Sequence, residues 1–124
     1  MTPTPEQELA LNRAIWNVDE TNCTPDGNGG YIVHTEKNYT RDLNAIVDVV
    51  QRWCEKRECR KYNITFRNHN LHNYECCVGG LEKGNYKGAG DWVFVSNKNP
   101  ALALSLAFAK AAGLKGEWDN GTLG

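Results

Sequence analysis

The chain has 124 residues, of which 40% are apolar and 23% are charged. This ordinary globular composition excludes a disordered tail, a collagen-like repeat and a coiled coil, and the length suits one domain. Fourteen Lys and Arg against 15 Asp and Glu give a formal net charge of -1. No global positive field favours nucleic acid and no acidic bulk favours a basic partner, so any partner must be recognised locally.

The N-terminal segment and the cysteines indicate a cellular compartment. Residues 1–8 contain two prolines and two glutamates and no basic-then-apolar run, so they do not resemble a secretory signal. The longest apolar stretch, 101–109, is interrupted by Ser105 and falls well short of the ~20 residues that cross a bilayer. Five cysteines, two of them adjacent at Cys76 and Cys77, do not form a tidy disulfide framework. We expect a cytoplasmic protein with reduced thiols and no membrane association.

Two amphipathic helices are predicted in the first half of the chain. Thr4 and Gln7 form a capping box around a proline, which predicts a helix over about 5–17. Thr40 can cap a second helix over about 41–57, whose apolar residues recur at helical spacing. These residues are Leu43, Ile46, Val47, Val50, Trp53 and Cys54.

Four segments have strand character. After a turn-rich stretch, residues 31–34 predict a short edge strand. Apolar and polar residues alternate over 62–67 and again over 73–78, which predicts two antiparallel strands joined as a hairpin. The segment 91–96 is apolar on both faces, so we expect it to be a central strand covered on both sides.

A third helix is predicted from Asn99-Pro100 to Gly113. It is apolar nearly all round, so it must be deeply packed or covered by a partner, and we expect it to be the most buried element. It should pack on the sheet against either Trp92 and Phe94 or Val93 and Val95. The element order predicts an α+β fold, sandwich-like, in which a small antiparallel sheet of three to four strands packs with three helices. We expect one domain over 1–113 and a polar C-terminal tail over 114–124.

Two segments carry a resemblance to a known family. Residues 39–50, which begin Tyr39-Thr40-Arg41-Asp42, and residues 96–113, which include Asn99-Pro100 and an alanine-leucine run, open two of the predicted helices. In these segments the chain resembles the phage ABA sandwich domain family of small tailed-phage proteins. The first helix departs from that family's Met-Gly-Trp ending, since only Trp16 corresponds. The resemblance implies a phage or prophage origin and supplies no catalytic residues.

Histidines and cysteines at short spacing suggest metal or thiol chemistry. His69, His72 and Cys76 could ligate zinc, but the compact ligand pairs of a structural zinc site are missing. Cys77 could pair with His72 or His34 as a nucleophile and base, but no sequence signature orients the base. We therefore predict no metal, no cofactor and no catalytic residue, with a zinc module or minor enzyme as the less favoured alternative.

The segment 79–90 is the first candidate binding loop, because five of its twelve residues are glycine. Lys83 and Lys87 could contact phosphates, and Tyr86 could stack on a base or fill a partner's pocket. The segment lacks the ending of a P-loop and precedes a strand, and as a flexible connection it needs no ligand.

A basic group at the end of the second helix is the next candidate. Arg57, Arg60 and Arg67 are its binding candidates, with Arg52 and Lys56 nearby. Cations at a helix C-terminus are also stabilised by the helix dipole alone, without any partner.

The function expected from these features is non-enzymatic binding. The first hypothesis is a phage-encoded accessory protein that binds a host protein or host immune component, acting in anti-defence in the host bacterial cytosol. The alternative is a sponge for a phosphate-bearing nucleotide signal. Nucleic acid is not indicated. The apolar third helix and the weakly covered sheet also predict self-association, as a homodimer.

Overall fold

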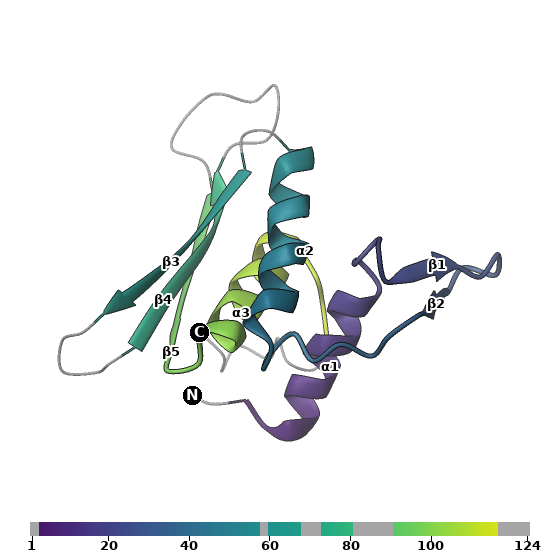
Figure 1. The fold of residues 1–124 in the computed structure, drawn as a ribbon, viewed down its shortest axis with the longest axis horizontal. Helices are drawn as coiled ribbons and strands as arrows, with labels where there is room; N and C mark the ends of the chain where they lie inside the picture. The colour runs from purple at the N-terminus through teal and green to yellow at the C-terminus, as the bar shows by residue number, and fades with distance from the viewer. Residues whose placement is uncertain (1–2, 58–59, 68–72, 81–90, 117–124) are drawn as a thin grey trace.

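The computed structural model describes residues 3–57, 60–67, 73–80 and 91–116. Its helices and strands form an α+β fold with two antiparallel sheets, which confirms the predicted fold class (Figure 1). The elements in chain order are α1 (Pro5–Trp16), β1 (Cys23–Pro25), β2 (Tyr31–Val33), α2 (Leu43–Lys56), β3 (Arg60–Arg67), β4 (Asn73–Gly80), β5 (Asp91–Asn97) and α3 (Pro100–Ala111).

The helix starts follow their capping residues. At α1, Thr4 and Gln7 form the predicted capping box. At α2 the cap is Asp42, whose side chain accepts a hydrogen bond from the Ala45 N–H, and not Thr40 as expected. Thr40 is instead fully buried two residues upstream, where its side chain binds other elements. The shift arises because α2 begins at Leu43, so that Asp42 and not Thr40 stands directly before the first helical residue.

The larger sheet has the strand order β3-β4-β5, so β4 is the central strand. The prediction that 91–96 is a central strand covered on both sides is wrong, because among the described strands β5 pairs with β4 alone and forms an edge of the sheet. Val95 faces the core, whereas Trp92 and Phe94 point to the other face and are 40% and 59% exposed. The apolar run is therefore explained by one core-facing row and one exposed aromatic row.

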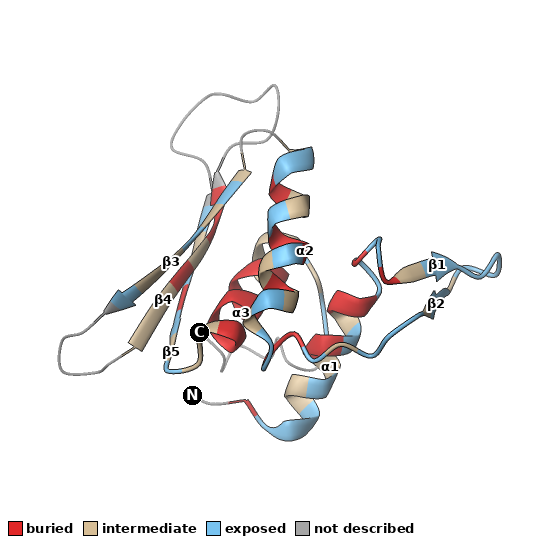
Figure 2. Cartoon of the chain, viewed as in Figure 1, coloured by how far each residue is buried: buried red, intermediate tan, exposed pale blue. Residues whose placement is uncertain are grey.

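All three helices lie on one side of this sheet (Figure 1). Helix α3 packs on β4 and β5, α2 packs on α3 and β3, and α1 packs on α3. The nine consecutive residues 101–109 are buried, so α3 is surrounded on most of its circumference (Figure 2). This confirms that α3 is the most buried helix and assigns its sheet contact to the Val93 and Val95 row.

The smaller sheet is a β1–β2 hairpin that projects from the helices on the side away from the larger sheet (Figure 1). Strand β1 is absent from the sequence prediction, since Pro25 in a three-residue segment disfavours a strand except at an edge. The hairpin turn is held by Asp26, and Gly27 and Gly29 adopt φ of 85° and 86°. A side chain at either glycine would strain the turn.

No helix within the described ranges is long and apolar enough to span a membrane. The apolar surface of α3 is instead buried inside the domain. Leu114, just after α3, also packs against the core, and its N–H donates to the carbonyl of Ala109 at 2.9 Å. The rest of the predicted tail from residue 117 lies outside the described residues.

Candidate functional site

The predicted loop candidates Lys83, Tyr86 and Lys87 lie outside the described residues, as do His69 and His72. For Arg67 the structure describes only the backbone, in β3. The remaining two candidates come together at one aromatic ring. The guanidinium carbon of Arg57 lies 4.4 Å from the ring centroid of Trp53, and that of Arg60 lies 5.9 Å from it.

Arg57 and Trp53 belong to the wall of a cleft of about 510 Å³. One wall is the C-terminal half of α2 with the end of α3, and the other is the α1–β1 connection with the β1–β2 hairpin. Its charged lining residues are Glu20, Arg52, Lys56 and Arg57. Its aromatic lining residues are Tyr31, Trp53 and Phe108.

Helical spacing brings Arg52, Lys56 and Arg57 together on one side of the cleft, which we call the cationic wall. Arg52 and Lys56 are four residues apart on α2, so they occupy successive turns of one face. Trp53 and Arg57 have the same spacing one residue later. The Arg57 Nη1 donates to the carbonyl oxygen of Trp53 at 3.1 Å, which holds the guanidinium against the ring. The rings of Trp53 and Phe108 pack in a T-shaped arrangement with their centroids 5.6 Å apart.

A buried carboxylate fixes Arg52 in this wall. Asp19 is fully buried and accepts hydrogen bonds from Tyr39 Oη at 2.6 Å, Arg52 Nη2 at 2.8 Å and Thr21 Oγ1 at 3.0 Å. Arg52 Nη2 also lies 2.7 Å from Asp48 Oδ2. The Asp19 carboxylate therefore ties the α1–β1 connection to α2.

The pKa values in this network follow from burial and hydrogen bonding. Burial alone raises the pKa of the Asp19 carboxyl, but the hydrogen bonds from Tyr39 and Arg52 outweigh it, so the net pKa is lowered. Burial and the bond to Asp19 raise the pKa of the Tyr39 hydroxyl well above its ordinary value. Asp19 stays ionised and enclosed, which suits a structural anchor and not a proton-transfer group.

The three cations of the cleft differ in their partners. Arg52 is held by Asp19 and Asp48, and Lys56 forms an ion pair with Glu20. Within the part of the chain that the structure describes, Arg57 has no carboxylate partner. Arg57 is therefore the cation of this cleft that is free to pair with an anion.

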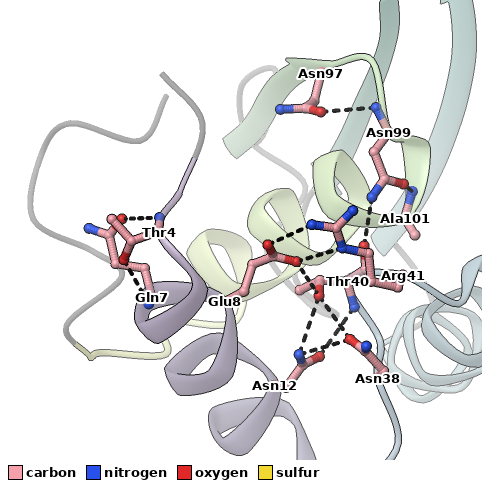
Figure 3. A network of polar contacts seen from close by, with 10 residues as sticks. All are labelled: Thr4, Gln7, Glu8, Asn12, Asn38, Thr40, Arg41, Asn97, Asn99 and Ala101. Carbon is pink, nitrogen blue, oxygen red and sulfur yellow. Dashed lines mark hydrogen bonds and ion pairs between the residues drawn. The ribbon is translucent and has the colours of Figure 1, made fainter.

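A second polar network joins the segment before α2 to α1 and to the start of α3 (Figure 3). The backbone N–H of Thr40 donates to Asn12 Oδ1 at 3.2 Å, and its carbonyl accepts from Asn99 Nδ2 at 2.8 Å. Its hydroxyl donates to Glu8 Oε1 at 2.9 Å, and Glu8 also binds the guanidinium of Arg41. These bonds satisfy buried backbone groups, so the network is best explained as structural.

The thiols lack the environment of a nucleophile. Burial raises the pKa of Cys54 to about 11 and that of Cys76 to about 12, and it also raises the pKa of Cys77. Cys23, Cys54, Cys76 and Cys77 are all free thiols. His34 hydrogen-bonds Thr24 of β1, and the β1–β2 hairpin lies on the other side of the helices from β4, the strand that contains Cys77 (Figure 1).

Among the described residues, no group of three His, Cys, Asp or Glu side chains could hold a metal ion. The predicted zinc alternative can be followed only at Cys76, which lies in the core. Its sulfur contacts the carbonyl oxygen of Pro100 at 3.7 Å.

The outer face of the larger sheet is a second candidate surface. The β4–β5 register places Phe94 beside Cys77, and the β3–β4 register places Asn63 on the other side of Cys77. Trp92 lies two residues before Phe94 in β5 and therefore on the same face of the sheet. All described helices pack on the opposite face, so this aromatic row remains exposed.

Sequence reasoning located the cationic wall of the cleft but missed its acidic side. Arg52 and Asp19 are 33 residues apart, and Lys56 and Glu20 are 36 apart, so no local spacing predicts these pairs. The two adjacent carboxylates after α1 were the only available signal.

In comparisons with family models, with curated proteins and with solved structures, none matches this chain.

Proposed function

We propose that this protein acts by binding, without catalysis, as a phage-encoded accessory protein in the cytosol of a host bacterium. The phage origin depends on the resemblance of residues 39–50 and 96–113. The binding role is supported by the chemistry of the described residues. The enclosed Asp19 is engaged by Tyr39 and Arg52, and the thiol pKa values are raised, so neither group is poised for proton transfer or nucleophilic attack.

The partner we propose is a host protein, in particular a component of host immunity, bound at the outer face of the sheet. The observation that carries this is the exposure of Phe94 at 59% beside Trp92, on a face that the described helices leave uncovered. Aromatic side chains are enriched at protein interfaces and supply much of their binding energy. Exposed aromatic rows of this kind mark interaction surfaces.

In the isolated protein, we propose that a second copy occupies the same face and forms a closed homodimer. A two-fold axis would place the aromatic row of one sheet on the sheet of the other, as in isologous interfaces. Host partner and second copy would then compete for Phe94 and Trp92.

Site-specific photocrosslinking tests both proposals. The photoreactive residue p-benzoylphenylalanine replaces Phe94 in bacterial cells, and a matched variant carries it at Leu9, which is exposed on α1. We expect adducts at position 94 and not at position 9, either with a second copy or with one host protein identified by mass spectrometry. Equal labelling at both positions, or none at 94, would exclude the outer face as the interface.

A nucleotide sponge is the second candidate function. The observation that favours it is the cleft of about 510 Å³, which combines the cations Lys56 and Arg57 with the aromatic side chain of Tyr31. Its volume lies within the ~300–1,000 Å³ range of small-molecule sites.

A further inference from the structure

The geometry points to a nucleoside phosphate as the ligand of this cleft, with its phosphates on Arg57 and Lys56 and its base against Tyr31. This inference rests on the second candidate function, and it assigns the site to the cleft and not to the glycine-rich loop.

Arg57 is arranged as the phosphate anchor. Its guanidinium carbon lies 4.4 Å from the centroid of the Trp53 ring, and one of its N–H groups donates a hydrogen bond to the Trp53 carbonyl. The planar fork of arginine carries five N–H groups, so the others remain for an anion. Stacking and the backbone bond fix the side chain in place before a ligand arrives, which lowers the entropy lost on binding.

Lys56 supplies a second cation through an exchangeable ion pair. Its partner Glu20 is 68% exposed and Lys56 is 57% exposed, so both remain well hydrated. A phosphate can replace the Glu20 carboxylate at Lys56, and Glu20 then returns to water. Arg52, in contrast, is held by the buried Asp19 and serves as a fixed part of the wall.

The opposite wall offers a surface for a flat, partly apolar group. Tyr31 is 50% exposed on β2 and lines the cleft, where Val18 and Pro25 of the same wall add apolar surface. A base stacked on an aromatic ring gains affinity with little dependence on base identity. Phosphates at one wall and a base at the other match a nucleotide better than a bare anion, which would use only the cationic wall.

Isothermal titration calorimetry with the four ribonucleoside 5′-triphosphates, each alone in magnesium-free buffer, tests the inference. We expect at least one to bind, and Arg57→Ala to weaken that binding tenfold or more, which corresponds to about 1.4 kcal/mol. The matched control is Lys98→Ala. It removes an exposed cation before α3, at the far end of that helix from the cleft, and should leave affinity unchanged.

Two further variants separate the site from effects on folding. Lys56→Ala removes an exposed side chain, and we expect a threefold or greater loss of affinity with an unchanged melting temperature. Tyr31→Ala should weaken nucleoside triphosphates but leave the weak binding of inorganic tripolyphosphate unaltered.

Several results would overturn the inference. These are no saturable binding of any of the four nucleotides, equal affinity in Arg57→Ala, Lys56→Ala and Lys98→Ala, tripolyphosphate binding as tightly as the nucleotides, or equally tight binding of hexaglutamate. The crosslinking experiment at position 94 tests the outer face of the sheet, whereas the calorimetry tests the cleft, so either proposal can fail while the other holds.

Discussion

The hydroxyl of Tyr39 donates a hydrogen bond of 2.6 Å to Asp19, and neither side chain is accessible to solvent. The other oxygen of Asp19 accepts from Arg52 on α2. One carboxylate therefore joins the connection after α1, the segment before α2 and α2 itself. This junction also holds Arg52, which lines the cleft, in position.

We predict that Asp19→Asn lowers the free energy of unfolding at pH 7 by about 3 kcal/mol. The substitution removes the buried negative charge that holds Arg52, so Arg52 keeps only the more exposed Asp48, and breaking a buried ion pair is strongly destabilising. Urea denaturation followed by circular dichroism measures the change. The matched control Glu36→Gln alters an exposed carboxylate and should shift stability by no more than about 0.5 kcal/mol.

The ion pair of Asp19 and Arg52 also predicts that the free energy of unfolding depends on pH. The pKa of Asp19 is lower in the folded chain than its ordinary value of 3.8, so its stabilising contribution is complete above that value. The contribution disappears as pH falls through the lowered folded-state pKa. The difference in unfolding free energy between wild type and Asp19→Asn should therefore be constant from pH 7 to 5 and shrink below about pH 4. A difference that stays the same down to pH 2 would contradict the ionised state of Asp19.

We predict that Leu106→Ala lowers the unfolding free energy by about 2–5 kcal/mol, the usual cost of such a cavity. Leu106 is buried on α3, which packs against the sheet, α2 and α1. Leu102→Ala should cost a similar amount, whereas Leu9→Ala on the exposed side of α1 should cost far less. Losses below about 1 kcal/mol at both α3 positions would show that the helix is not part of the core.

Thiol reactivity should follow burial. With the disulfide reagent DTNB at pH 8, we expect Cys77 and Cys23 to react in the native protein. Cys54 and Cys76 should react only on unfolding, because burial raises their pKa values to about 11 and about 12. Denaturation without reductant should release close to five thiols per chain. Fast reaction of Cys76 in the native state would mean that its strand opens readily.

We predict that Phe94→Lys abolishes self-association, because a charge on the outer face cannot be buried against a second copy without a partner. Sedimentation velocity at micromolar concentrations should show a dimer for wild type and a monomer for the variant. The melting temperature of the monomer should hardly change, since Phe94 is mostly exposed. A monomer for wild type as well would remove the proposed homodimer.

Local signals predicted most of the fold. The capping box at Thr4 and the helical spacing from Leu43 to Cys54 fixed two helices, and alternation fixed β3 and β4. The place of β5 in the sheet could not be predicted, because an apolar run does not reveal whether its second face is covered. Trp92 and Phe94 are exposed on that face.

The site was less accessible to sequence reasoning. Arg57 and Arg60 were identified because they follow α2 as part of a basic group. The carboxylates Asp19 and Glu20 were not, because only tertiary packing brings the α1–β1 connection to α2. Contacts across more than 30 residues depend on the complete fold and leave no periodicity in the sequence.

The central place of α3 has a consequence for the order in which the chain folds. This helix lies among the last-synthesised parts of the described chain, yet β4, β5, α2 and α1 all pack against it. Until residues 100–111 leave the ribosome, α1, α2, β4 and β5 lack the helix against which they all pack. Leu11, Ile15 and Val50, which share one core with α3, therefore cannot be fully buried until that helix has emerged, and chaperones that bind apolar segments have that interval in which to act.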